Sequence, residues 1–244
     1  MIYRLKTCVA LLFLSIALLA HSGPGAHAGS SQPLTVVELF TSQGCSSCPP
    51  ADAYLGDLAA QGEEAGVLAL SFHVDYWDNL GWKDPYSNPD NTRRQRAYAS
   101  YMDLRYVYTP QMVVQGISQA TGSDRRAIAR QIKAASKLPA LAVDLQRNGK
   151  SMRVALSKNS RPVNANIFMV VYDKQHVTKI KRGENSGKTI TNRNVVRAIT
   201  KIGSWNGEAA SMALSPGDSG DACAVIIQSA ETGAILGAAT IVLN

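Results

Sequence analysis

The stretch TVVELFTSQGCSSCPPAD, residues 35–52, decides the fold that we expect for this chain. Its first six residues are mostly β-branched or apolar, which predicts a central strand buried on both faces, with Glu38 as the exception. Cys45 and Cys48 follow this strand and stand three positions apart, and a helix pattern begins directly after them. A Cys-x-x-Cys sequence between a buried strand and a helix is typical of a redox site.

Two prolines fix where the helix begins. Proline is tolerated in the first helical turn, and it disfavours helical angles in the residue before it. The regular helix is therefore predicted to start near Pro49 with Cys48 as its cap, and to stop at Gly62. Cys45 then lies in the loop before the helix. Because a helix N-terminus lowers a thiol pKa only over about one turn, we expect modest activation of Cys45.

The pattern after the first helix continues as a mixture of strands and helices. Residues 66–74 (GVLALSFHV) predict a second buried strand, parallel to the first through a right-handed crossover. Residues 75–108 form an aromatic insertion with a helical second half. After it, Pro110 opens a strand within TPQMVVQG, ISQATG is its hairpin partner, and residues 123–137 predict a helix. This first domain is expected to span residues 34–138.

Beyond Pro139 the pattern changes to strands. Alternating apolar runs occur in ALAVDLQ, SMRVALS, NIFMVVYD, CAVIIQ and ILGAATIVL, and one short helix is predicted at residues 194–201. The sequence therefore predicts a second, β-rich domain over residues 139–244.

The start of the chain predicts export. Arg4 and Lys6 precede an apolar run, and Ala26-His27-Ala28 is a small-x-small cleavage signal, so residues 1–28 are expected to be a signal peptide. The product is expected to be periplasmic or secreted without a stable membrane anchor, because the apolar run is too short for a membrane span. Cleavage lowers the formal net charge of the 244-residue chain from +7 to +5, and the remaining basic residues are scattered, which argues against nucleic acid as a partner.

These motifs together resemble known families. Residues 34–138 resemble the thioredoxin-like superfamily: VVELFTSQGCSSC is similar to the strand-to-CxxC entry of glutaredoxins, and YTPQMVVQG is similar to the cis-proline loop. The insertion VDYWDNLGWKDPYSNPDNTRRQRAY, with FTSQGCSSCPPAD and RGENSGKTITNRNVVRAI, resembles a family of secreted bacterial proteins known as domain of unknown function 1223. The resemblance implies an α/β, thioredoxin-like fold, a central mixed sheet flanked by helices, with a C-terminal β-rich domain.

The resemblance also assigns roles to residues. It implies that Cys45 is the exposed attacking thiol, that Cys48 is the resolving thiol, and that Thr109-Pro110 faces them with a cis bond. The implied activity is thiol-disulfide exchange through a mixed disulfide, with protein or small-molecule thiols and disulfides as partners and no organic cofactor. Thioredoxins place a buried aspartate six residues before the first cysteine. Here Leu39 has that offset, and Glu38 stands one residue earlier.

Several alternatives stay open for the cysteine pair and its neighbours. Cys45 and Cys48 form a redox-active pair, a structural disulfide, or part of a metal site in which His73 helps to hold Cu(I). Glu38 is either a buried carboxyl that shuttles the thiol proton or a salt-bridged strand residue. The corresponding rival functions are a non-enzymatic binding protein with a structural disulfide and a copper-delivery protein.

Three further features have simple interpretations. The aromatic insertion is expected to be a packed lid, with a ligand-binding box as the alternative. Arg93, Arg94 and Arg96 are expected to form a solvated helix face. Cys223 lies in an apolar strand, so it is expected to be an inert buried thiol, or else to pair with another chain.

Overall fold

The computed structural model describes residues 27–28, 33–149, 151–217 and 220–243. The predicted signal peptide lies outside the described residues except for its last two. The helices in the described part of the chain are α1 (Pro49–Gln61), α2 (Pro89–Tyr101) and α3 (Arg125–Ala135). A short 3-10 helix, η1 (Glu63–Ala65), follows α1. No helix in the described part of the chain is long and apolar enough to cross a membrane.

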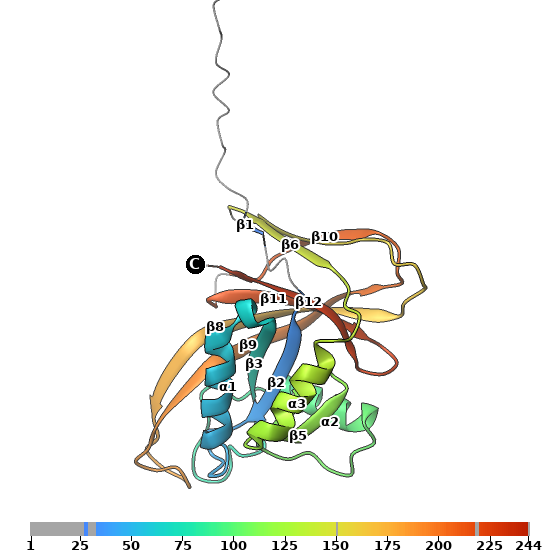
Figure 1. Cartoon of the computed structure of the whole chain (residues 1–244). Helices are drawn as coiled ribbons and strands as arrows, with labels where there is room; N and C mark the ends of the chain where they lie inside the picture. Colours follow the sequence, from blue (N-terminus) through green and yellow to red (C-terminus); the bar gives the residue numbers. More distant parts are fainter. Residues whose placement is uncertain (1–26, 29–32, 150, 218–219, 244) are drawn as a thin grey trace, which may run out of the picture.

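The strands form a large sheet and a small one (Figure 1). The large sheet has eight strands in the order β12 (Ile235–Val242), β11 (Ala222–Ser229), β8 (Ala165–Lys179), β9 (Thr189–Trp205), β3 (Val67–His73), β2 (Thr35–Thr41), β4 (Gln111–Val114), β5 (Ser118–Thr121). The small sheet has four in the order β1 (His27–Ala28), β6 (Val143–Asn148), β7 (Ser151–Leu156), β10 (Ala210–Leu214). The mixed α/β class with a large central mixed sheet is confirmed.

The centre of the large sheet follows from the crossover that the sequence predicts. β2 and β3 are parallel and in register from Thr35↔Val67 to Thr41↔His73, with α1 between them in the chain. β4 and β5 add an antiparallel hairpin beside β2. On the other side, β9 lies parallel to β3 where Ser71 pairs with Val195. Four of the strands that follow residue 139, β8, β9, β11 and β12, therefore extend the same sheet, while the division into two domains stays a prediction.

The short helix predicted over residues 194–201 is wrong. Those residues belong to β9, which pairs with the long strand β8 from Lys179↔Thr189 to Ala165↔Trp205. Residues 189–205 are rich in Thr, Val and Ile, which suit a pleated surface, and their neighbours on both sides supply hydrogen bonds to the backbone. Tertiary pairing therefore overrides the local pattern.

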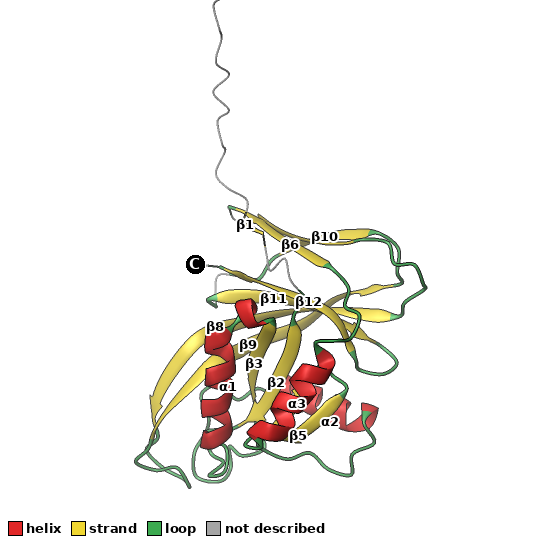
Figure 2. Ribbon diagram, viewed as in Figure 1, coloured by secondary structure: helices red, strands yellow, loops and turns green. Residues whose placement is uncertain are grey.

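Two faces of the large sheet carry different cores. The helices α1 and α3 lie across one face of the sheet (Figure 2). Alternate residues of β2 point to opposite faces: Val36 and Phe40 pack on the α2 side, and Val37 and Leu39 pack against α1 and α3. The α2-side core continues through β3, β8 and β9 to Ala224 of β11. The small sheet packs against the opposite side of β8, β11 and β12 through a third core, so it shares a face with α1 and α3. This arrangement leaves the carboxyl ends of β2 and β3 at one edge of the molecule.

Candidate functional site

The two cysteines close a tight loop where β2 passes into α1. Cys45 and Cys48 form a disulfide. The Cys45 N–H donates to the Ser42 carbonyl at 3.1 Å and the Cys48 N–H donates to the Cys45 carbonyl at 3.2 Å, so two successive turns lead into the helix. Cys48 is the N-cap with φ −77° and ψ −35°, and α1 begins at Pro49 as predicted. The disulfide therefore lies at the carboxyl end of a central parallel strand and at a helix N-terminus.

The Thr109-Pro110 loop lies beside this turn. The bond between the two residues is cis. A Cβ placed on Gly122 would lie 3.3 Å from Pro110 Cβ and 2.9 Å from Ala51 Cβ, so Pro110 packs next to the first turn of α1. The indole of Trp77 donates to Thr109 Oγ1 at 2.8 Å, and its Cβ lies 3.4 Å from the place where Gly44 would carry a Cβ. Trp77 thus links the Thr109-Pro110 loop to the CxxC loop.

The expectation that Cys45 is exposed is wrong. Cys45 and Cys48 both have 0% of their surface exposed, although Ser46 and Ser47 between them are exposed. The physical reason is the β8–β9 connection, residues 180–188, which folds across the CxxC loop. The buried Asn185 side chain donates from Nδ2 to the carbonyls of Gln43 and Cys45, each at 2.9 Å.

Further contacts hold the β8–β9 connection in place. Glu184 Oε2 accepts from the Ser46 N–H at 3.1 Å, and Lys188 Nζ donates to Asn185 Oδ1 at 2.9 Å. Gly183 has φ +75° and packs against Trp82, which belongs to the aromatic insertion. Glycine is needed there because a side chain would be strained at this φ and would meet Trp82 Cβ at 3.2 Å. The connection and the insertion therefore meet over the disulfide.

Glu38 was expected to be either a proton-shuttling carboxyl or a salt-bridged strand residue, and in the structure it is salt-bridged. Its fully buried carboxylate accepts from Arg94 Nε at 2.7 Å and from Arg94 Nη2 at 2.6 Å, and the Tyr98 hydroxyl donates to it at 3.1 Å. Glu38 shares the α2 face of β2 with Phe40, whereas Thr41 contacts α1 on the other face. Glu38 is thus separated by the sheet from the helix that begins at Cys48.

The prediction of a solvated arginine face is wrong for Arg94. Arg93 and Arg96 are exposed, but Arg94 turns inward and its Nη1 also donates to Gln228 Oε1 at 3.2 Å. A bidentate guanidinium-carboxylate pair satisfies a charge that would otherwise be costly to bury.

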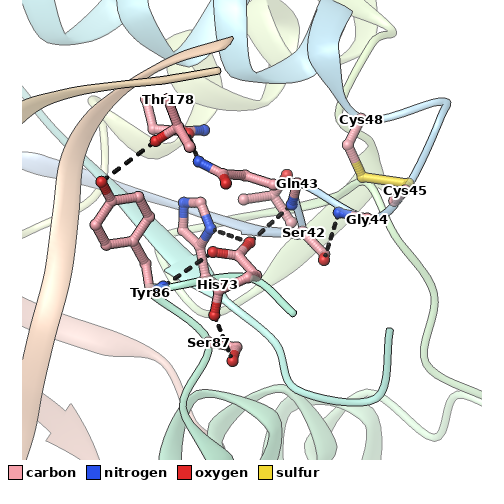
Figure 3. Close-up of polar contacts among 12 residues, drawn as sticks. Ser42, Gln43, Gly44, Cys45, Cys48, His73, Tyr86, Ser87 and Thr178 are labelled. Atoms are coloured by element: carbon pink, nitrogen blue, oxygen red, sulfur yellow. Dashed lines mark hydrogen bonds and ion pairs between the residues drawn. A yellow bond between two sulfur atoms is a disulfide. The ribbon is translucent and has the colours of Figure 1, made fainter. Parts of the chain in front are cut away.

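Behind the disulfide lies a buried polar cluster, shown in part in Figure 3. Gln43 is its centre: its N–H donates to Asp84 Oδ2 at 2.7 Å, its Nε2 donates to Asn192 Oδ1 at 2.9 Å, and its Oε1 accepts from the Trp82 indole at 3.2 Å. His73 Nδ1 lies 2.7 Å from Asp84 Oδ2. The cluster thus links Gln43 to the aromatic insertion, to β3 and to β9.

Asp52, one helical turn after Cys48, is the second acidic group of this region. It is buried, and its Oδ1 accepts from Thr41 Oγ1 at 2.9 Å. Burial raises the pKa of Asp52 to about 7, and the nearby positive charge of His73 only partly opposes this effect. Burial therefore favours the protonated form of the Asp52 carboxyl well above the pH at which an exposed aspartate ionises.

His73 and Asp84 shift each other in opposite directions. Burial lowers the pKa of His73, but the charge and hydrogen bond of Asp84 outweigh it, so the net pKa lies above the usual 6.5. Burial raises the pKa of Asp84, but the charge and hydrogen bond of His73 and the N–H groups of Gln43 and Tyr86 outweigh it and lower the net pKa. The pair is thus ionised inside the protein at mildly acidic pH.

Comparison with known proteins places this geometry in a family. The family model described as "Protein of unknown function (DUF1223)" matches residues 36–228. The chain belongs to this family. The match includes the CxxC loop, the aromatic insertion, the Thr109-Pro110 loop and the β8–β9 connection, so all parts of the site lie within the family region.

Two solved structures are similar to this family member. A protein from Agrobacterium tumefaciens, solved by X-ray crystallography, is 29% identical, with a TM-score of 0.75 over 87% of this chain and 96% of that chain. HBP35 of Porphyromonas gingivalis is 14% identical, with a TM-score of 0.55 over 87% of this chain and 76% of that chain. No curated protein is matched by the chain.

Sequence reasoning missed the polar residues that surround the disulfide of this family member: Gln43, Asp52, Asp84, Asn185 and Asn192. Their spacing follows no motif, because they come from three stretches of the chain, residues 43–52, the aromatic insertion and residues 185–192, that only the tertiary structure joins. The resemblance carried by RGENSGKTITNRN was the available signal, since that segment contains Asn185 and Asn192. Within the described residues, no group of three or more His, Cys, Asp or Glu side chains is arranged to hold a metal ion.

The remaining predicted residues have packing roles in the structure. Cys223 is fully buried in the core between the two sheets, and burial raises the pKa of its thiol to about 12, which fits the inert-thiol interpretation. In the insertion, Trp77 and Trp82 use their indole N–H groups for internal hydrogen bonds, and Tyr86 stacks on His176 with ring centroids 4.4 Å apart. These contacts fit a packed lid.

Proposed function

We propose that the protein is an exported thiol-disulfide oxidoreductase of thioredoxin-like architecture. The observation that carries the proposal is the position of the Cys45–Cys48 disulfide, between a central parallel strand and the N-terminus of α1, with a cis Thr109-Pro110 loop beside it. A helix N-terminus favours the thiolate form, which is the reactive species in exchange. Export would place the pair in a compartment where disulfides form and persist.

The exchange would follow a mixed-disulfide route. The Cys45 thiolate attacks one sulfur of a substrate disulfide, a Cys45-substrate disulfide forms, and the other substrate sulfur leaves as a thiolate. Cys48 then attacks Cys45 Sγ, which restores the Cys45–Cys48 disulfide and releases the second substrate thiolate. The protein is oxidised and the substrate disulfide is reduced, and the same steps in reverse oxidise a substrate dithiol.

Access requires movement of the β8–β9 connection. Because Cys45 is fully buried, no substrate sulfur reaches it while Asn185 holds the carbonyls of Gln43 and Cys45. Displacement of residues 180–188 would free the CxxC loop on one side, while the Thr109-Pro110 loop stays against α1. We therefore propose that the disulfide is protected in the resting protein and reacts when this connection opens.

Trapping of the mixed disulfide tests the proposal. Reduced Cys48→Ser protein, incubated with glutathione disulfide, should accumulate a Cys45 adduct of one glutathione, detected by mass spectrometry. Cys45→Ser should accumulate less, and Cys223→Ser is the control that should behave as wild type. Wild-type protein that exchanges with neither glutathione disulfide nor dithiothreitol, even in mild urea, would contradict the proposal.

A second candidate is a binding protein whose disulfide is structural. The complete burial of both sulfurs favours it. The two functions differ in redox potential, because structural disulfides commonly have potentials below about −300 mV, whereas redox-active pairs lie higher. Equilibration of the Cys45–Cys48 pair against dithiothreitol measures this potential directly.

A further inference from the structure

The second step of the exchange requires a base that is not obvious from the sequence. Cys48 is the N-cap of α1 and is fully buried, so its sulfur has no direct contact with water in the resting protein. A buried thiolate without a partner is costly, which raises a thiol pKa. Glu38 lies on the opposite face of β2 and is held by two hydrogen bonds from Arg94. The proton acceptor must therefore come from another residue.

Asp52 has the required position. The Asp52 N–H donates to the Cys48 carbonyl at 3.0 Å, and Cys48 has helical angles, so the two residues are helical neighbours four positions apart. Side chains at this spacing lie on one face, with Cβ atoms about 5–6 Å apart, and helical side chains lean toward the N-terminus. Asp52 therefore lies one helical turn from Cys48, on the face of α1 that meets Thr41 at the end of β2.

One carboxyl oxygen of Asp52 is free to take a proton. Oδ1 accepts from Thr41 at 2.9 Å, whereas buried Oδ2 has no partner at normal hydrogen-bond distance among the described residues. The side-chain amide of Asn192 approaches the Asp52 carboxyl and helps to lower its pKa, and Asn192 Nδ2 is likewise buried without a partner at that distance. Buried polar atoms without a partner are rare, and such an atom calls for an explanation. Protonation at Oδ2 would leave the bond from Thr41 to Oδ1 intact.

Asp52 also has a route to solvent. It lines a groove of about 660 Å³ between α1 and the start of β9, together with Gly56, Lys188 and Arg193. Because Asp52 Oδ2 is itself buried, a proton accepted there can leave through this groove when the side chain or the start of β9 moves.

We propose that Asp52 accepts the proton of the Cys48 thiol as Cys48 attacks the mixed disulfide at Cys45. This inference rests on the proposed function. The proton passes from Cys48 Sγ to Asp52 Oδ2, the Cys48–Cys45 bond forms, and the Cys45–substrate bond breaks with its electron pair on the substrate sulfur. The substrate leaves as a thiolate and no other oxidant is needed. In the reverse direction, Asp52 returns the proton to Cys48.

The surroundings of Asp52 set the pH at which this step works. Burial raises its pKa to about 7. The charged groups around it are His73 on β3 and Asp84 in the insertion, and Asp57, Lys188 and Arg193 line the groove. The carboxylate is the acceptor, so the step should accelerate as Asp52 loses its proton near pH 7.

The experiment compares Asp52→Asn with Asp144→Asn, which changes an exposed acid on β6 that does not line the groove. The reduced proteins react with excess glutathione disulfide from pH 5.5 to 10, and mass spectrometry follows conversion of the Cys45 adduct to the intramolecular disulfide. Wild type and Asp144→Asn should show an inflection near pH 7. Asp52→Asn should be at least tenfold slower at pH 7, with its inflection moved toward the pKa of the Cys48 thiol, and nearly as fast as wild type at pH 10.

Thr41→Val supplies a second test that keeps the carboxyl in place. Loss of the hydrogen bond to Oδ1 should raise the pKa of Asp52, so the inflection should move to higher pH while the rate at pH 10 is kept. Equal pH profiles in wild type, Asp52→Asn and Thr41→Val would overturn the inference and leave the proposed function standing. If wild type forms no glutathione adduct at any pH, the proposed function itself fails.

Discussion

The side-chain amide of Asn185 donates a 2.9 Å hydrogen bond to the backbone carbonyl of Cys45, across 140 positions of the sequence. Its second bond, to the Gln43 carbonyl, fixes the same loop from the other end. One buried side chain on the β8–β9 connection therefore binds the CxxC loop at two points. If these two bonds are lost, the disulfide should become more accessible to a reductant.

Asn185→Ala should make the disulfide easier to reduce. The variant loses both bonds to the CxxC loop, so the β8–β9 connection should open more often, and reduction by a water-soluble phosphine should be at least fivefold faster. Stability should fall by about 1–3 kcal/mol because two buried carbonyls lose their donor. Ser186→Ala is the matched control, since Ser186 is exposed and bonds only within its own connection. An unchanged reduction rate would mean that another contact covers Cys45.

Removal of one partner of the buried Glu38–Arg94 pair should destabilise the protein strongly. Arg94→Met leaves the Glu38 carboxylate buried without its guanidinium, and the free energy of unfolding should fall by about 3–5 kcal/mol. Arg93→Met, one residue earlier and exposed, should change it by less than about 0.5 kcal/mol. Urea denaturation measures both. A Glu38→Leu/Arg94→Met double variant that is as unstable as Arg94→Met would show that lost packing, and not the stranded charge, is the cause.

The His73–Asp84 pair should stabilise the protein within a limited pH range. The pKa of Asp84 is lowered in the folded state, so its contribution is present above the unfolded value near 3.8 and is lost as pH falls through the folded pKa. The pKa of His73 is raised, so its contribution is complete below 6.5 and is lost as pH rises through the folded pKa. The destabilisation caused by Asp84→Asn should therefore be largest between about pH 4 and 6.5, as measured by urea denaturation across pH. A destabilisation independent of pH would rule out the ionised pair as its source.

Asp52 should have the opposite effect on stability. Its pKa is raised from 3.8 to about 7 by burial, so the folded protein holds a proton that the unfolded chain releases, and stability should decrease as pH rises from 4 to 7. The full shift corresponds to roughly 4 kcal/mol. In Asp52→Asn this decrease should be absent, so the stability of the variant relative to wild type should increase as the pH rises. Parallel stability curves for the two proteins from pH 4 to 8 would contradict the raised pKa.

Gly122→Ala should separate the Thr109-Pro110 loop from α1. The added methyl would lie 2.9 Å from Ala51 Cβ, which is too close, so stability should fall by about 1–3 kcal/mol. Ala51→Gly in the same chain removes the opposing methyl and should recover part of the loss. Gly203→Ala is the control, because its nearest contact, at 3.4 Å, is the end of the flexible Met212 side chain. Thermal or urea unfolding of the four proteins checks the expected order.

The sequence by itself determined the local framework of this protein. The apolar run at residues 35–40 specified β2, Pro49 and Gly62 specified the two ends of α1, and the strand pattern of GVLALSFHV specified the parallel partner β3. These features are local because backbone angles, periodicity and capping depend on residues within a few positions of one another.

Only the tertiary structure decided what surrounds the disulfide. Whether Cys45 is exposed depends on Asn185, and whether Arg94 is solvated depends on Glu38, 56 positions away. β9 became a strand because β3 and β8 lie on either side of it, although its local sequence also suggested a helix. Burial, buried ion pairing and sheet extension arise between segments far apart in the chain, and no local pattern records which segments will meet. The same is true of the pKa of Asp52, because desolvation depends on the whole of its surroundings.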